Sequence, residues 1–459
     1  MNNILEHKSF LKLNFLSRII LSYSLFVILT LSLNSNNLDR LSSFFIVTIC
    51  AILALFILCF QINTKVGSNF LVIILTGFII KLFLGYLFWE FYIFPDYFSN
   101  PFSVFKFDHM EYLYTESLMR DFAQQRIENG FFYFSPQMAL YKHFEIHYFM
   151  SNLYISGSFN PFDLAVQNAL FSIYTSFIVF GIANMLCANS TQLQFALILA
   201  VFQPFSMISS TIWRDVVGQF FVSLGGYVLF IAMSKRTIEA FVLIVIATIS
   251  MYIQRFNYVF FPFIIYGTFL ITKANKKVFF TLPVMLGLLI YFDNYFGIIS
   301  GLLNDYGGNL ASISLWLLLP LNVVRIFIGA FPWVNWFNFD DNSIFLIAGY
   351  FESVFLITMM FILFHHLRKK YNKNQPLSFI ETLLMLLFGL FIFSAFGTVE
   401  IHQGYMSIGA IFIIPVISKL SGIKNFIIYS IFIFLVFICA NVLYIILGLR
   451  GLGIGTSIR

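Results

Sequence analysis

Long apolar stretches, separated by short polar segments, follow one another along almost the whole chain. Most approach the roughly 20 residues that an α-helix needs to cross the hydrocarbon core of a bilayer, and some are shorter. The pattern therefore predicts about 13 membrane-spanning helices. Their expected ranges are 15–33, 43–61, 70–94, 165–187, 192–210, 217–233, 238–253, 257–272, 278–292, 344–366, 378–396, 406–420 and 425–448.

The composition agrees with this pattern. Of the 459 residues, 60% are hydrophobic and only 10% are charged, whereas soluble domains have about 45–50% apolar and about 25% charged residues. These values exclude a water-soluble enzyme, a nucleic-acid-binding protein and a disordered regulator. We therefore expect an all-α polytopic membrane protein with about 12–14 transmembrane helices, in which residues 1–459 form a single transmembrane domain.

The distribution of charge predicts the orientation in the membrane. The expected loops and helix ends on one side hold more than half of the 26 Lys and Arg residues, and the only acids there are Glu6, Glu239 and Glu381. Loops rich in Lys and Arg face the cytoplasm, so the N-terminus is expected to be cytoplasmic. The net charge of +6 is then mainly an orientation signal.

Two segments depart from the pattern of spans and short loops. Residues 95–164 are expected to form a large amphipathic periplasmic loop, rich in acidic and aromatic residues, with a surface helix at about 108–128. Asn160-Pro161 is expected to open the next span, because Pro is favoured early in a helix. The run 311–333 is apolar but is interrupted by Pro320, Arg325 and Pro332, which predicts a re-entrant or interfacial periplasmic element at 311–342.

Placing an ionisable side chain in or near the membrane costs free energy, so each such residue is a candidate for a structural or functional role. Asp108 opens the expected surface helix, where it either complements the helix dipole or acts as a general base. Arg214 and Asp215 end a span as a local ion pair, or they bind a phosphate or carboxylate group. Arg255 and Arg325 either extend toward the membrane surface or bind a lipid diphosphate.

Other polar residues leave similar alternatives open. Lys81 and Glu352 lie within expected spans, each as a relay group or as half of a buried pair. The segment His365–Lys370 is interpreted as a basic anchor on the inner leaflet. His143 and His147 have a spacing that can hold a metal, but no third ligand is apparent, so no metal site and no cofactor are expected.

Short motifs occur along the chain in a fixed order. They are Asp108 to Tyr112, Asn168, Pro204 with Ser209, Arg214-Asp215, Arg255-Phe256, Phe331-Pro332-Trp333, Glu352 and Gly397-Thr398. This order resembles the GT-C class of polyprenyl-dependent membrane glycosyltransferases, and most closely the Wzy-type polymerases of O-antigen and related polysaccharides. The final loop often carries an Arg in such proteins, whereas His402 stands in this loop here.

The resemblance implies an enzyme of the bacterial inner membrane that polymerises oligosaccharide repeat units linked to undecaprenyl diphosphate at the periplasmic face. It implies Asp108 as the base, with Glu111 or His402 as alternatives. Membrane lipids and a chain-length regulator protein are the other expected partners, and no nucleic acid is expected. The implied substrate-binding residues are Tyr112, Arg214, Asp215, Arg255 and Arg325.

Two other functions stay open at this point. One is a GT-C transferase that adds a single sugar from a polyprenyl phosphate donor. The other is a flippase or transporter of lipid-linked glycan. Transporters usually consist of paired structural repeats, and we find no such repeat in the sequence.

Overall fold

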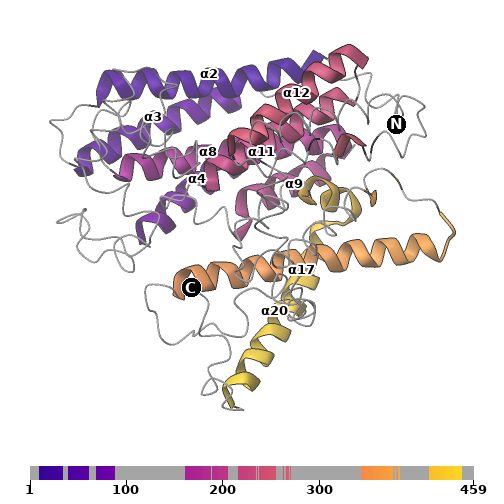
Figure 1. The fold of residues 1–459 in the computed structure, drawn as a ribbon. Helices are drawn as coiled ribbons and strands as arrows, with labels where there is room; N and C mark the ends of the chain where they lie inside the picture. Colours follow the sequence, from indigo (N-terminus) through magenta and orange to yellow (C-terminus); the bar gives the residue numbers. More distant parts are fainter. Residues whose placement is uncertain are drawn as a thin grey trace, which may run out of the picture. The chain divides into compact units, whose positions relative to one another are not determined.

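The computed structural model is helical throughout the part of the chain that it describes, and no strand occurs in that part. The chain divides into two compact units, Met1–Ser223 and Leu224–Arg459, whose helices are labelled in Figure 1. The described residues are 10–34, 40–60, 69–87, 161–187, 189–204, 215–233, 235, 237–254, 262, 265–267, 269, 343–375, 378, 381–382 and 413–446.

The helices of the first unit follow the apolar stretches of the sequence, and each begins within about five residues of the expected span. Helix α8 begins at Pro161, as expected from Asn160-Pro161. Residues 161–164 of the predicted loop 95–164 therefore belong to its first turn. The helices are α2 (Phe10–Leu33), α3 (Arg40–Phe60), α4 (Asn69–Leu87), α8 (Pro161–Leu186), α9 (Ser190–Phe202) and the first part of α11 (Asp215–Ala232).

Helix α8 is the centre of the first unit. It contacts α3, α4 and α9, and nearly all of its described side chains are buried. Helices α2 and α3, which lie side by side in Figure 1, instead carry large apolar side chains on their exposed faces, among them Ile20, Leu31 and Phe45. Apolar residues outside and polar residues inside are the arrangement expected of a protein dissolved in lipid.

Four of the described helical segments are long and apolar enough to cross a membrane: Phe15–Leu33, Ser42–Cys59, Ala165–Leu186 and Ile423–Ala440. Shorter apolar helices accompany them, such as Asn69–Gly85 and Gly218–Ala232. The chain is thus a multi-pass helical membrane protein, as its hydropathy predicts.

Side-chain hydrogen bonds show the relative directions of the helices in the first unit. Ser43 hydrogen bonds to Asp163, and Ser22 hydrogen bonds to both Ala54 and Tyr174. Ser43 and Ala54 on α3 are eleven positions apart, as are Asp163 and Tyr174 on α8. Because each residue of a helix rises by the same amount, α3 and α8 run parallel.

Helix α4 runs antiparallel to α8. The ring of Phe70, near the start of α4, contacts Phe177 and Phe180 late in α8, whereas Lys81 farther along α4 bonds to Ser172. The C-terminal end of α4 and the N-terminal end of α8 therefore lie on the same side of the unit. This is the arrangement that a long connection on one face of the membrane requires.

Gly77 marks a close approach of α4 and α9. A Cβ atom at this position would collide with Val201 Cγ1 on α9, and a β-branched side chain in a helix cannot easily move aside. Small residues commonly let membrane helices come this close.

We expect Gly77→Ala to lower the free energy of unfolding by about 1–3 kcal/mol through overpacking. Adding Val201→Ala should recover most of the loss, which unfolding of the purified protein in detergent would measure. Gly267→Ala is the matched control, because a Cβ atom there meets nothing within 4 Å. Equal losses for Gly77→Ala and Gly267→Ala would contradict the close approach.

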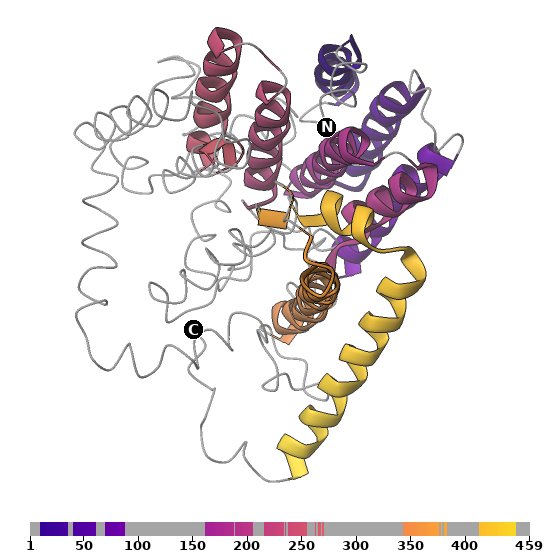
Figure 2. The same cartoon turned by 90° about the vertical axis from the view of Figure 1, so that its right-hand side faces the viewer.

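The second unit contains the rest of α11, helix α12 (Thr237–Gln254), α17 (Ser343–Tyr371) and α20 (Ile423–Ile446). Residues 413–420 form another helix that meets α20 at a bend (Figure 2). The rings of Phe351 and Phe434 stack, and Phe361 contacts Tyr429. The rings of Phe355 and Phe426 also contact each other, so α17 and α20 cross at an angle near the middle of α17 (Figure 1).

Helix α17 ends in a Schellman motif. Asn374 has φ 49°, the left-handed conformation that Asn tolerates better than most residues. The amide of Gln375 donates to the Lys370 carbonyl oxygen at 3.1 Å, and the amide of Asn374 donates to that of Tyr371 at 3.0 Å. These two bonds satisfy carbonyl groups of the last helical turn.

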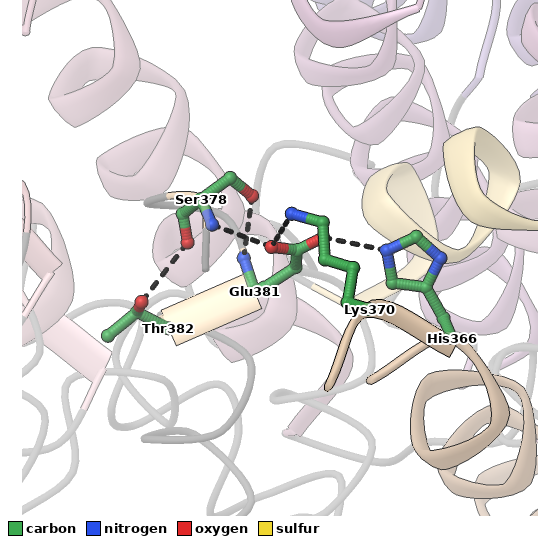
Figure 3. Close-up of polar contacts among 5 residues, drawn as sticks. All are labelled: His366, Lys370, Ser378, Glu381 and Thr382. Atoms are coloured by element: carbon green, nitrogen blue, oxygen red, sulfur yellow. Dashed lines mark hydrogen bonds and ion pairs between the residues drawn. The ribbon is translucent and has the colours of Figure 1, made fainter. Parts of the chain in front are cut away.

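A capping box follows this turn. The Ser378 amide donates to Glu381 Oε2 at 2.6 Å, and the Glu381 amide donates to Ser378 Oγ at 3.4 Å. The same carboxylate accepts hydrogen bonds from Lys370 Nζ at 2.6 Å and His366 Nε2 at 2.7 Å (Figure 3). The Ser-x-x-Glu pattern before an apolar run is the usual sequence of such a cap, and here it also joins the next segment to the end of α17.

Glu381 makes this connection sensitive to acid. Burial of the carboxyl raises its pKa, but the bonds from Lys370, the Ser378 amide and His366 outweigh burial and lower the pKa from 4.5 to about 2. A depressed carboxyl pKa contributes stability above its unfolded value, and the contribution is lost as the pH falls.

We therefore expect the thermal unfolding midpoint of the wild type to fall as the pH is lowered from about 4.5 toward 2. Glu381→Gln should reduce this pH dependence and lower the midpoint at neutral pH. The control is Glu239→Gln, because Glu239 is exposed and pairs with Lys235 only one turn away. If the wild type and Glu381→Gln had the same pH profile, this role of Glu381 would be refuted.

Candidate functional site

Most of the residues that the sequence analysis selected lie outside the described residues. The surface helix at 108–128, the element 311–342 and the pair His143 and His147 also lie outside them. The selected residues concerned are Asp108, Glu111, Tyr112, Arg214, Arg255, Arg325 and His402. The structure places four other motif positions: Asn168 on α8, Pro204 just after α9, Asp215 at the start of α11 and Glu352 in α17.

The polar residues of α8 lie on two faces of this buried helix. Residues three or four positions apart share a helix face. Asp163, Gln167 and Tyr174 therefore occupy one face, and Asn168, Ser172 and Ser176 occupy another. All of these side chains are buried. These two polar faces give α8 two sets of directional contacts. Such contacts specify which helices pack together in lipid, because hydrophobic packing alone has little specificity there.

The first face binds α2 and α3. Asp163 Oδ2 accepts hydrogen bonds from Ser43 Oγ at 2.6 Å and from Asn34 Nδ2 at 3.3 Å. Deeper in the unit, Ser22 Oγ donates to the Ala54 carbonyl oxygen at 2.7 Å and lies 2.9 Å from the Tyr174 hydroxyl. Because the Ser22 proton goes to Ala54, the Tyr174 hydroxyl donates to Ser22. The three helices are thereby joined at two depths.

The second face binds α4 and α9. Ser176 Oγ lies 2.9 Å from the Ala200 carbonyl oxygen on α9. One turn earlier on α8, Ser172 Oγ accepts a hydrogen bond from Lys81 Nζ at 2.7 Å. Asn168 lies one further turn toward the N-terminal end of α8. Lys81 therefore contacts this second face at Ser172, midway between Asn168 and Ser176.

Lys81 is the most unusual of these residues. Its side chain is fully buried, and a charged residue at the middle of a span costs about 2.5–3.5 kcal/mol on insertion scales. A hydrogen bond to a charged group contributes about 1.5–3 kcal/mol, so the Ser172 bond offsets only part of that cost. Of the two roles considered for Lys81, relay group and buried pair, the structure identifies Ser172 as one partner and leaves both roles open.

The start of α11 also lies close to this interior. The ring of Phe220 contacts the rings of Phe171 and Tyr174 on α8, and Asp215 precedes Phe220 by five residues, about 7.5 Å along a helix. The neighbouring Gln219 is buried. The motif positions Asn168 and Asp215 thus belong to two helices that contact each other in the first unit.

Sequence reasoning missed the polar contacts that hold this unit together. Asp163 falls within the loop predicted at 95–164, but it lies in the first turn of α8 and is fully buried. Its place two residues after Pro161 was the available signal, because Pro is favoured at the first position of a helix and acids in the first turn. Ser22, Ser43 and Tyr174 gave no signal, since their partners come from distant parts of the chain.

The arrangement provides a buried cation, several hydroxyl groups and a buried carboxylate within one helical unit. Such groups inside a membrane protein commonly mark a site for a polar substrate or ion. Comparison with protein-family models, with curated proteins and with solved structures finds no match for this chain.

Proposed function

We propose that the protein polymerises oligosaccharide repeat units linked to undecaprenyl diphosphate, at the periplasmic face of the bacterial inner membrane. The observation that carries the proposal is the order of the short motifs from Asp108 to Gly397-Thr398. The proposal includes a GT-C-like arrangement of about 12–14 spans and a cytoplasmic N-terminus.

In the proposed reaction, a sugar hydroxyl of the incoming repeat unit attacks the anomeric carbon of the growing glycan. The bond between that carbon and the diphosphate oxygen breaks, and undecaprenyl diphosphate leaves. Asp108 takes the proton of the attacking hydroxyl as general base, with Glu111 or His402 as alternatives. Arg214, Arg255 and Arg325 stabilise the negative charge of the leaving diphosphate, and Asp215 positions Arg214.

The described part of the chain supports two elements of this proposal. The C-terminal end of α4 and the N-terminal end of α8 lie on one side of the first unit, which suits a large loop carrying Asp108 and Tyr112 on one membrane face. Asp215 begins a helix that contacts α8, the helix of Asn168. Motif positions far apart in the sequence thus occur on neighbouring elements.

A deletion strain of the source bacterium tests the proposal, with the surface glycan separated by length. Loss of long chains with single repeat units retained would support a polymerase. Loss of one sugar from each repeat unit would instead show a single-sugar transferase. Accumulation of lipid-linked units on the cytoplasmic side would show a flippase, and either of these results would overturn the proposal.

A further inference from the structure

The C-terminal end of α17, the helix at 413–420 and the N-terminal end of α20 are densely basic. The exposed cations there are Arg368, Lys369, Lys373, Lys419 and Lys424, which we call the basic end. They come from two segments about 50 residues apart in the sequence.

The basic residues of α17 lie on different faces of the helix. His366 and Lys370 are one turn apart and both point to Glu381 (Figure 3), whose side chain is only 4% exposed. Arg368, two positions from each of them, lies on the opposite face of the helix. Arg368 and Lys369 are both exposed. Within the described parts of the chain, neither of these two side chains has an acidic partner.

Aromatic side chains flank the outward cations. Tyr371 is 82% exposed and Phe364 is 65% exposed, one on either side of Arg368 and Lys369 in the sequence. Aromatic rings beside Lys and Arg at the end of an apolar helix are typical of the membrane–water interface. Helix α20 also carries exposed apolar residues, among them Ile428, Phe432 and Leu435.

From this arrangement, we propose that the basic end binds the phosphate headgroups of anionic phospholipids. Arg368 and Lys369 bind the headgroups, with Lys373 and Lys424 extending the positive surface. His366 and Lys370 do not take part, because Glu381 already neutralises that face. A Lys or Arg near a membrane surface attracts anionic lipid, and a cluster of them does so cumulatively. This binding is independent of the glycan chemistry proposed above.

The test uses the full-length protein in mixed micelles with equal amounts of phosphatidylglycerol and phosphatidylcholine, and native mass spectrometry of the retained lipid. We expect wild-type protein to retain phosphatidylglycerol preferentially. Arg368→Gln/Lys369→Gln should weaken this preference by about fivefold for each cation removed. The unfolding midpoint in phosphatidylcholine alone should stay at the wild-type value, because both side chains are exposed.

Lys235→Gln is the matched control for Arg368→Gln, since it also removes one exposed cation, but one that pairs with Glu239 at 3.4 Å. It should leave the lipid preference unchanged. Three results would each overturn the proposal: no preference in the wild type, equal loss in Lys235→Gln and Arg368→Gln, or displacement of phosphatidylglycerol by an equal concentration of inorganic phosphate. If the double variant fails to fold, the two single variants replace it.

Discussion

Replacing Asp108 by Asn should abolish long glycan chains while the protein still inserts into the membrane at the wild-type level. An amide keeps the size and polarity of the side chain but cannot accept the proton of the attacking hydroxyl. General-base catalysis typically contributes a factor of about 10²–10⁴ in rate. The measurement is the length distribution of glycan in cells that produce the variant, followed by the turnover number with purified lipid-linked repeat units.

The matched control for this substitution is Asp121→Asn. Asp121 lies in the same predicted loop and loses the same charge, but it belongs to none of the motifs. Glycan of normal length is expected from this variant. Normal glycan from Asp108→Asn as well would exclude Asp108 as the base and leave Glu111 and His402 to be tested in the same way.

The Ser172 hydroxyl should prove more important for stability than a buried hydroxyl group that bonds only within its own helix. Ser172→Ala removes one acceptor of Lys81 Nζ, and hydrogen bonds to charged groups contribute about 1.5–3 kcal/mol. We expect a loss of that size in the free energy of unfolding in detergent. Ser223→Ala is the matched control, because the buried Ser223 hydroxyl bonds to a carbonyl oxygen of its own helix.

A double-mutant cycle separates the contact from other effects of the substitution. Lys81→Met places an apolar side chain of similar length in the same space. Replacing a buried ion and its partner by apolar groups is often neutral or stabilising, so Lys81→Met/Ser172→Ala should be more stable than Ser172→Ala. If Ser172→Ala and Ser223→Ala lose equal stability, the Lys81 contact contributes nothing.

The helices could be predicted from the sequence because each one depends on the hydropathy and length of its own segment. The spans expected at 15–33, 43–61 and 165–187 correspond to α2, α3 and α8, since an apolar stretch of that length has few alternatives to a helix in lipid. Pro161 marked the start of α8, and Ser-x-x-Glu at 378–381 is a sequence signal for a cap. The candidate site was harder to predict from the sequence. Asn168 and Asp215 were selected through a resemblance to a family and not from the residues that surround them in the structure.

By itself, then, the sequence determined that this chain is a multi-pass helical membrane protein, where its described helices begin, and that its basic residues cluster in a few segments. Only the tertiary structure decided which polar residues meet. In the sequence, Ser172 is one of several hydroxyl residues of α8, and only the packing of α4 shows that it bonds to Lys81. Asp163 falls within the predicted loop, and only the packing of α2 and α3 shows that it bonds to Asn34 and Ser43. The reason is physical: hydropathy depends on each segment alone, whereas a buried hydrogen bond depends on a partner that the chain supplies from far away.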